Sequence, residues 1–201
     1  MVIELVVASR NVHKTREIQH ILGPDFTLRD LQAFPEIPNI PESGTSFEQN
    51  AKLKALAVSR QLRALVIADD SGLEIDALDG APGIYSARYA GTNATDTDRI
   101  NKLLGELARV GAAERRRARF RCAVALAHNG NLLETFDGIV EGRIADEVCG
   151  DSGFGYDPIF IPDGFEQTFG ELPPEVKDAI SHRAKAIRAL ADTLRRRDFR
   201  G

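Results

Sequence analysis

Two adjacent carboxylates, Asp69 and Asp70, follow the short apolar run at residues 65–68 and precede Ser71 and Gly72. The apolar run has the character of a buried strand, and neighbouring side chains on a strand point to opposite faces. One aspartate can therefore face a cleft while the other braces the turn. Carboxylates at the exit of a strand suit Mg²⁺, which takes oxygen ligands and shares them with phosphate. A turn rich in Asp, Ser and Gly explains the same residues without any chemistry.

A second polar stretch, S-R-N-V-H-K at residues 9–14, lies between an apolar run at residues 2–8 and a helical pattern that ends at Gly23-Pro24. A helix start after a strand offers backbone N–H groups and the positive end of the helix dipole to an anion. Ser9 and Asn11 can add hydrogen bonds, and Lys14 adds a point charge for phosphate. The stretch lacks the glycines of a P-loop. A capped helix start is the alternative interpretation.

Glu42 lies in a proline-rich loop at residues 34–43, just before a predicted helix. Thr45 and Glu48 match a capping box, T-x-x-E, which places the helix from there to about residue 60. Asn50 and Lys54 are four residues apart and share a face of that helix. Glu42 could complete a metal site with the two aspartates, although a loop glutamate in water is the alternative.

The glycine-containing loop D-S-G-F-G-Y-D-P-I-F at residues 151–160 carries two aromatic residues, Phe154 and Tyr156. Glycines allow the backbone to approach a ligand closely, and aromatic rings can stack on a planar base. Asp157 could accept hydrogen bonds from base N–H groups. A β-turn with two core aromatics is the alternative interpretation.

Proline residues at 173 and 174 predict the start of a last helix that ends near residue 196. This helix carries Lys177 and the run Ser181-His182-Arg183. A histidine on a helix is usually a surface or core residue, and an adjacent arginine adds a modest indication of an anion or carbonyl contact.

The composition is that of a soluble globular protein of one domain, or one domain with a small lobe: 201 residues, 43% apolar and 28% charged. The net charge of −4 gives no global basic field that would attract nucleic acid. The basic residues form two clusters, Arg115, Arg116, Arg117, Arg119 and Arg121, and Arg195, Arg196, Arg197 and Arg200. Solvated faces explain both clusters, and a subunit contact or phosphate steering is the alternative.

Neither Cys122 nor Cys149 lies in a metal-binding spacing, which argues against a disulfide framework and structural zinc. The N-terminus has no basic region before its apolar run, so we expect a strand and not a signal peptide. No apolar run approaches the roughly 18 residues that cross a membrane. These features predict a soluble cytoplasmic protein that does not bind membranes.

The order of elements predicts an α/β fold with a central mixed sheet, in two lobes around a cleft. Strand-helix-strand units come first, and two long strands at residues 118–128 and 131–140 follow. Asn129-Gly130 joins these two strands and is a strong hairpin signal. Cys122 falls on the apolar face of the first of them, so we expect a core residue and not a nucleophile.

Six motifs occur together in an order typical of one family: S-x-N-x-x-K at 9–14, E-S-G-x-S-F-x-x-N-A at 42–51, A-D-D-S-G-L at 68–73, G-x-P-G-I-Y-S-A-R-Y at 80–89, F-G-Y-D-P-I-F at 154–160 and S-H-R at 181–183. On these motifs the chain resembles the inosine triphosphate pyrophosphatases, enzymes that remove non-canonical purine nucleotides. The resemblance covers nearly the whole chain. Arg10 stands where the family usually has a glycine.

The resemblance implies hydrolysis of ITP, dITP and XTP to the monophosphate and pyrophosphate with Mg²⁺, for which Mn²⁺ could substitute. It implies a single catalytic domain over residues 1–201, an elongated mixed sheet, a homodimer and no nucleic-acid partner. Glu42 and Asp70 would bind the metal, Asp70 would accept the proton of the attacking water, and Asp69 and Lys54 would support them. The substrate-binding residues would be Ser9, Arg10, Asn11, Val12, His13, Lys14, Ser71, Phe154, Gly155, Tyr156, Asp157, Lys177, His182 and Arg183.

The chemistry of these residue types agrees with that reaction. Cleavage between the α and β phosphates needs an activated water and neutralised charge, and lysines at 14 and 54 would offset developing negative charge. Donors from His182 or Arg183 to the 6-oxo group would select the base. Two other functions stay open: a pyrophosphatase for pyrimidine or modified nucleotides, and a nucleotide- or RNA-binding module that uses residues 115–121 without turnover.

Overall fold

The computed structural model describes residues 2–110 and 116–196 and divides into two compact units. Unit 1 comprises Met1–Asp70, Cys122–Gly138 and His182–Gly201, and unit 2 comprises Ser71–Arg121 and Ile139–Ser181. Three of the unit boundaries fall inside long strands, and the fourth lies between Ser181 and His182, where one helix has ended and the next begins. The expected single domain over residues 1–201 and the cleft stay predictions.

Six strands form one sheet in the order β2-β1-β3-β4-β5-β6. Their bounds are β1 Ile3–Val7, β2 Phe26–Asp30, β3 Leu65–Ile75, β4 Arg117–His128, β5 Asn131–Ile144 and β6 Phe160–Pro162. β1 pairs in parallel with both β2 and β3, whereas β5 and β6 are antiparallel. The mixed sheet confirms the predicted α/β class.

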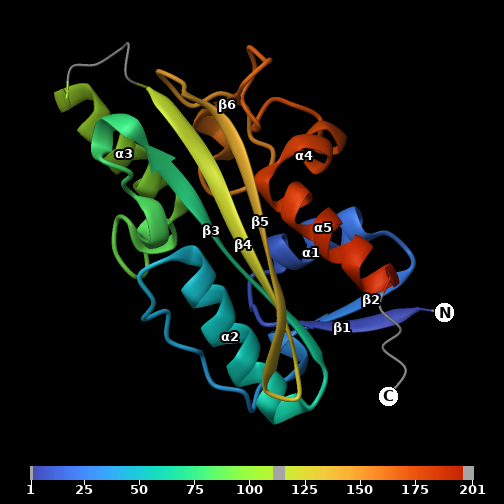
Figure 1. Cartoon of the computed structure of the whole chain (residues 1–201). Coiled ribbons are helices and arrows are strands. Elements are labelled where there is room, and N and C mark those ends of the chain that lie inside the picture. The colour runs from blue at the N-terminus through green and yellow to red at the C-terminus, as the bar shows by residue number, and fades with distance from the viewer. Residues whose placement is uncertain (1, 111–115, 197–201) are drawn as a thin grey trace. The chain divides into compact units, whose positions relative to one another are not determined.

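Among its described residues, unit 1 contains three α-helices: α1 Val12–Leu22, α2 Phe47–Leu62 and α5 His182–Arg196 (Figure 1). The three residues at the end of β1 are all buried, as expected for a parallel strand covered on both faces. Apolar residues of α1 and α5, such as Ile18 and Leu190, pack with Val7 and Ile67 in one core. This core holds the carboxyl end of β1, where α1 begins.

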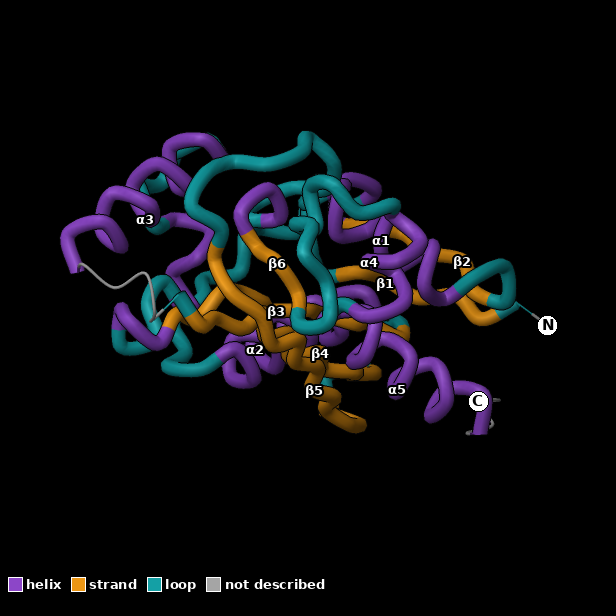
Figure 2. Tube along the Cα trace, turned by 90° about the horizontal axis from the view of Figure 1, so that it is seen from above, coloured by secondary structure: helices purple, strands orange, loops and turns teal. Residues whose placement is uncertain are grey.

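Unit 2 has its own core, formed by the helix α3 Asp96–Val110 and the strand segments of this unit (Figure 2). Leu103 and Leu107 of α3 pack in the same cluster as Ile75. Phe120 and Phe160 lie in this core with their ring centroids 4.6 Å apart. A short helix, α4 Pro174–Ile180, completes the unit, together with 3₁₀ turns at Asp76–Leu78, Gly83–Arg88 and Asp157–Ile159.

β3 continues through the aspartates, so the strand does not end at residue 68 and the alternative interpretation of residues 69–72 as a turn is wrong. Asp69 and Asp70 occupy the middle of an eleven-residue strand and are both buried. Buried carboxylates are costly unless cations and hydrogen bonds compensate them, and such partners are present here. The polar residues therefore do not force a turn. The predicted opposite orientation of the two side chains still follows from the strand.

The last helix is interrupted, so the expected single helix from residue 174 to 196 is also wrong. Ser181 has φ −63° and ψ 159°, an extended conformation that ends α4 before α5 begins at His182. Serine favours such non-helical positions because its hydroxyl competes for backbone hydrogen bonds. As a result Lys177 belongs to unit 2, whereas His182 and Arg183 belong to unit 1.

The capping box of α2 is one residue later than the predicted T-x-x-E. Ser46 is the N-cap, and its hydroxyl accepts a hydrogen bond from Gln49 N at 3.2 Å. The Gln49 side chain in turn accepts from Thr45 N at 2.9 Å. The reciprocal hydrogen bond therefore goes to the residue before the N-cap, and Gln49 can make it because Gln, like Glu, offers a side-chain oxygen.

The predicted hairpin between β4 and β5 is confirmed. Asn129 and Gly130 both have positive φ, 49° and 78°, as a two-residue turn of this kind requires. Within the described residues, no helix is long and apolar enough to cross a membrane.

Candidate active site

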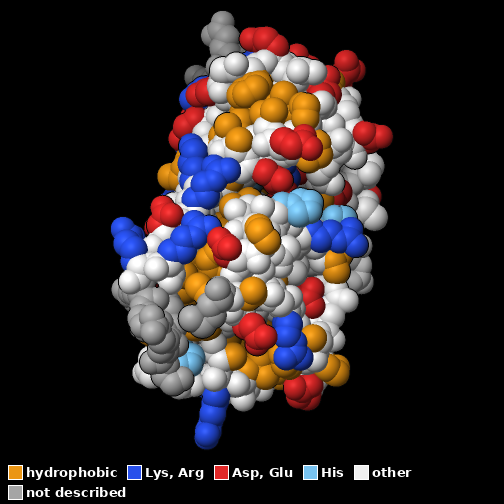
Figure 3. Space-filling view, turned by 90° about the vertical axis from the view of Figure 1, so that its right-hand side faces the viewer, with side chains coloured by type: hydrophobic (Ala, Val, Ile, Leu, Met, Phe, Trp, Pro, Cys, Tyr) orange, Lys and Arg blue, Asp and Glu red, His pale blue; other side chains and the backbone are white. Residues whose placement is uncertain are grey.

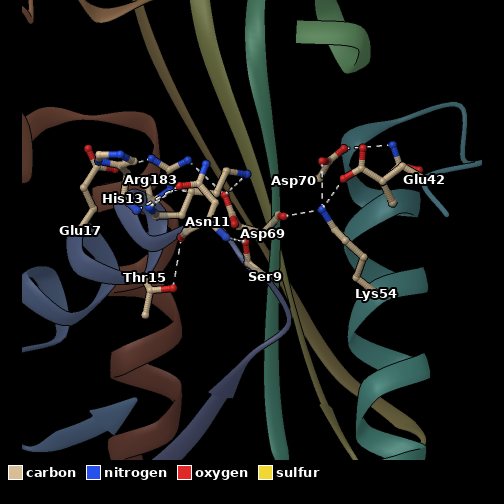
Figure 4. Close-up of polar contacts among 12 residues, drawn as sticks. Ser9, Asn11, His13, Thr15, Glu17, Glu42, Lys54, Asp69, Asp70 and Arg183 are labelled. Atoms are coloured by element: carbon tan, nitrogen blue, oxygen red, sulfur yellow. Dashed lines mark hydrogen bonds and ion pairs between the residues drawn. The ribbon is translucent and has the colours of Figure 1, made fainter. Parts of the chain in front are cut away.

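The first aspartate of β3, Asp69, points toward α1 and α5 and is surrounded by cations (Figure 4). Lys14 Nζ lies 3.0 Å from Asp69 Oδ2. The Arg183 guanidinium donates to the same oxygen through Nε at 3.3 Å and Nη2 at 3.1 Å. Arg183 is 2% exposed and forms a second ion pair with Glu17 of α1. Four charged groups from three elements of unit 1 thus form one buried network.

This network holds Asp69 in its ionised form. Burial alone would raise the pKa of Asp69, but Lys14, Arg183 and Lys54 outweigh burial and hold the pKa well below its usual range. A carboxylate that stays charged and engaged is poorly suited to accept a proton. Asp69 therefore acts as a fixed negative charge that orients Lys14.

The second aspartate, Asp70, points to the opposite face, toward α2 (Figure 4). Lys54 Nζ lies 3.1 Å from Asp70 Oδ1 and 2.9 Å from Glu42 Oε1, and it also donates to the Asp69 carbonyl at 2.8 Å. The Asn50 amide donates to the other Asp70 oxygen at 3.0 Å. Asn50 and Lys54 share one face of α2, as expected, and this explains why both reach the Asp70 carboxylate.

The protonation equilibria on this face differ from those around Asp69. Burial raises the pKa of Asp70 against the opposing effects of Lys54 and Lys14. Burial would lower the pKa of Lys54, but Asp70, Asp69 and Glu42 reverse the effect and raise it. Lys54 is thus a permanent cation, while Asp70 is the carboxylate of the pair with the greater affinity for a proton.

Glu42 and Asp70 both contact the ammonium group of Lys54, so their carboxylate oxygens converge on a place that favours positive charge. Such a pair of carboxylates also fits a hard divalent cation. The described residues contain no group of three or more His, Cys, Asp or Glu side chains that could hold a metal. Mg²⁺ commonly binds to only one or two carboxylates and takes its remaining ligands from water and substrate phosphates. Two carboxylates are therefore sufficient for such a site.

The turn at residues 9–14 is a capped helix start, as the alternative interpretation supposed. The Asn11 side-chain oxygen accepts from His13 N at 3.0 Å and Lys14 N at 3.3 Å. The Ser9 hydroxyl accepts from Asn11 N at 3.1 Å. Two helix N–H groups that could have bound an anion are thus occupied, whereas Val12 and His13 are exposed beside them.

Arg10 is exposed as a residue, but its guanidinium is engaged in hydrogen bonds. Its guanidinium donates to the carbonyls of Leu31 and Ile37, at 2.5 and 2.6 Å, and to Asn39 Oδ1 at 3.2 Å. These contacts join the turn to the loop that leads to Glu42, and a phosphate-binding role for Arg10 stays a prediction.

In unit 2, the loop at residues 153–157 is organised around a buried ion pair between Asp157 and Lys177, whose Oδ2 and Nζ atoms are 2.6 Å apart. The same Asp157 oxygen accepts from Phe154 N at 2.8 Å. Lys177 Nζ lies 4.8 Å from the centroid of the Phe154 ring. Gly155 N donates to Asp96 Oδ2 at 2.6 Å, which ties the loop to the start of α3. The structure thus brings together Phe154, Gly155, Asp157 and Lys177, as predicted.

The two aromatics of this loop differ in their environment. Tyr156 is 4% exposed in the core of unit 2, and its hydroxyl donates to the Ser86 carbonyl at 3.0 Å. Its ring therefore belongs to the core, as the alternative interpretation supposed for both aromatics. Phe154 is half-buried, which leaves it as the aromatic of this loop suited to stacking.

The residues expected to read the base with Lys177 lie in unit 1. Arg183 is engaged with Asp69 and Glu17, so its guanidinium orients the carboxylate network. His182 is buried at the start of α5. Ser71 is half-buried in β3, directly after Asp70.

The model of the Ham1 family matches residues 5–193. The chain belongs to the Ham1 family. Curated relatives include a dITP/XTP pyrophosphatase from Geobacter sulfurreducens, 49% identical over 191 residues that cover 94% of this chain and 96% of the relative. Another, from Shouchella clausii, is 46% identical over 95% of this chain and 96% of the relative, and is also named a dITP/XTP pyrophosphatase.

Solved Ham1 structures have the same fold. A HAM1 protein from Coxiella burnetii superposes with a TM-score of 0.87 at 41% identity, covering 98% of this chain and 100% of the other. A nucleoside-triphosphatase / dITP/XTP pyrophosphatase from Mycobacterium abscessus gives a TM-score of 0.75 at 42% identity, covering 94% and 98%. The expected family is confirmed, and so is the expected class of enzyme, a nucleoside-triphosphate pyrophosphatase.

The sequence analysis missed two residues of the site. Glu17 neutralises Arg183 from α1, three residues after Lys14, and had no motif to mark it. Asn50 entered the sequence analysis as part of the 42–51 motif and for sharing a face with Lys54, without a role of its own, although it contacts Asp70 directly. It is fully buried in the first turn of α2, which only the structure shows.

Proposed function

We propose that the chain hydrolyses nucleoside triphosphates with non-canonical purines, dITP, XTP and ITP, to the monophosphate and pyrophosphate, with Mg²⁺ as cofactor. The convergence of Glu42 and Asp70 on Lys54 is the observation that carries this proposal. The names of the relatives support the choice of dITP and XTP. The expected homodimer, the cytoplasmic location and the substitution of Mn²⁺ for Mg²⁺ stay proposals as well.

Unit 1 supplies the groups assigned to the triphosphate. Lys14, held by Asp69, gives a positive charge at the start of α1. The Asn11 oxygen caps the helix, which leaves its amide nitrogen to donate to a phosphate oxygen. Ser9 adds a hydroxyl on the same turn. These groups would compensate charge that develops on the phosphates, the principal requirement of phosphoryl-transfer catalysis.

Asp70 is the residue assigned to accept a proton from the attacking water. The pKa of Asp70 is raised and that of Asp69 is lowered, so Asp70 is the stronger base of the two. Asn50 and Lys54 fix the orientation of its carboxylate. When bound at Glu42 and Asp70, Mg²⁺ would supply Lewis-acid stabilisation of phosphate oxygens.

Unit 2 supplies the aromatic ring and the ion pair assigned to the base, whereas the assigned donor, His182, belongs to unit 1. Phe154 offers a ring face, and Lys177 and Asp157 form the buried pair behind it. His182 remains the proposed donor to the 6-oxo group. A buried donor left unpaired by a 6-amino base would disfavour ATP strongly.

The test is release of pyrophosphate by the purified protein at catalytic concentration, with dITP, XTP, dATP, dGTP, dTTP and UTP compared at equal Mg²⁺. We expect dITP and XTP to be turned over fastest, and Asp70→Asn to reduce the rate at least a hundredfold, in line with loss of a general base. Preference for dTTP or UTP would establish the pyrimidine alternative. Retained turnover in Asp70→Asn would refute the assigned base.

Arginines of the 115–121 cluster that the structure describes are engaged in ion pairs. Arg117 pairs with Asp163 at 2.7 Å, and Arg119 with Asp76 at 2.8 Å and Glu141 at 3.1 Å. Arg115, Arg197 and Arg200 lie outside the described residues. On the face drawn in Figure 3, acidic and basic side chains are interspersed. These neutralised charges speak against a binding module without turnover.

A further inference from the structure

We infer that Arg10 is a positioning residue for the metal-binding carboxylate: its guanidinium fixes the loop that carries Glu42 to the turn at residues 9–14. The inference rests on the proposed function, in which Glu42 is a metal ligand. Every residue involved belongs to unit 1.

Arg10 binds three points of one loop. Nη1 donates to Leu31 O at 2.5 Å, Nη2 to Ile37 O at 2.6 Å and Nε to Asn39 Oδ1 at 3.2 Å. The planar guanidinium is suited to this because its donors point in fixed, different directions. The Leu31 N–H also donates to Ser9 O at 3.0 Å, so main chain and side chain join the turn and the loop together.

The loop needs such an anchor because it has little packing of its own. Between residues 32 and 45, only Ile37 is fully buried. Prolines at positions 35, 38 and 41 restrict the backbone of the loop. Asn39 lies three residues before Glu42, a span of about 10 Å at most. Fixing Ile37 and Asn39 therefore limits where the Glu42 carboxylate can lie.

The other side of Glu42 is anchored independently. Gly44 N donates to Asn50 Oδ1 at 2.8 Å, and the same Asn50 side chain binds Asp70. A Cβ at Gly44 would lie 2.7 Å from Gln49 Cβ, so the backbone here is packed closely on α2. Glu42 thus lies between an anchor made by Arg10 and one made by Asn50. Loss of Arg10 should free one end of this segment and leave the other in place.

The experiment compares Arg10→Ala with Arg10→Lys and with Arg16→Ala, which removes an exposed arginine of α1 outside this set of contacts. The rate of dITP hydrolysis is measured as a function of Mg²⁺. We expect Arg10→Ala to raise the Mg²⁺ concentration for half-maximal rate about fivefold to tenfold, as loss of about one net hydrogen bond would. Additional Mg²⁺ should recover most of the rate. Arg10→Lys should show a smaller shift, and Arg16→Ala should match the parent.

Two measurements without turnover separate this inference from the proposed function. Mn²⁺ binding to the protein alone, followed by electron paramagnetic resonance, should weaken in Arg10→Ala by a similar factor. Hydrogen exchange should accelerate at residues 31–43 and stay unchanged in α5. An unchanged Mg²⁺ dependence and unchanged exchange would overturn the role of Arg10. A lower rate that Mg²⁺ does not recover would also overturn it and indicate direct contact with the triphosphate. Absence of dITP hydrolysis by the parent protein would instead refute the proposed function.

Discussion

Asp69 and Asp70 are chemically identical neighbours with different surroundings. The strand directs one toward the cations of α1 and α5 and the other toward α2. Asp69 compensates two cations, Lys14 and the fully buried Arg183, whereas Asp70 shares Lys54 with Glu42. The first is therefore mainly important for stability and orientation, and the second for chemistry.

Asp69→Asn should lower the free energy of unfolding by about 3 kcal/mol or more, because it leaves Arg183 and Lys14 without their shared carboxylate. Asp70→Asn should cost about 1 kcal/mol, because Lys54 keeps Glu42 and the Asp69 carbonyl as partners. Urea denaturation of both variants at pH 7 measures this difference. Equal losses of stability would show that the two environments are equivalent.

At the scale of elements, the sequence predicted those features that depend on interactions between neighbouring residues. Asn129-Gly130 specified its hairpin because the required backbone angles are a property of those two residues. The split at Ser181 could not be predicted from the apolar pattern, which continues on both sides of it. The same holds for Glu17 and Arg183, which are 166 residues apart and meet only because α1 and α5 pack together.

Close approach of β5 to α5 depends on Gly138. A Cβ at this position would lie 1.9 Å from the backbone oxygen of His182, the first residue of α5. Gly138→Ala should therefore displace the start of α5 and the Arg183 guanidinium beside it, with a loss of about 2 kcal/mol or more and reduced activity. Thermal denaturation and dITP turnover measure the two effects.

Gly105 provides the matched control for that prediction. It lies in α3, and a Cβ there would meet nothing within 4 Å. Gly105→Ala should stabilise the protein by about 0.5–1 kcal/mol, because alanine is the better helix former. Comparable destabilisation of both variants would mean that the contact at His182 is unimportant.

At the scale of the whole molecule, the family could be predicted from the sequence because six short motifs occur in a fixed order. The boundaries of the two units could not, since three of them cut through β3, β4 and β5, where the apolar pattern is continuous. Whether an aromatic side chain of the 151–160 loop supports the core or the site also depends on packing. Tyr156 and Phe154 are two residues apart in one glycine-containing loop and have different environments.

The two cysteines lie in different units, so their reactivity measures the exposure of each unit separately. Cys122 lies in the core of unit 1, and burial raises its pKa to about 12, whereas Cys149 is half-exposed in unit 2. The raised pKa disfavours the thiolate of Cys122, and the thiolate is the reactive form. Iodoacetamide should thus modify Cys149 in the native protein and Cys122 only as urea unfolds unit 1. Mass spectrometry of the modified peptides measures this order, and rapid native labelling of Cys122 would contradict the buried core.

The ammonium group of Lys54 has a consequence for how the protein is made and stored. It balances Glu42 and Asp70 with a charge that belongs to the chain itself. Newly synthesised molecules should thus reach their native fold before any divalent ion is captured, with no separate metal-loading step during maturation. Treatment with EDTA should abolish dITP turnover while changing the melting temperature by less than about 2 °C, which corresponds to at most about 1 kcal/mol for a chain of this size. Calorimetry before and after chelation measures it, and a melting temperature that collapsed on chelation would mean that Lys54 does not suffice.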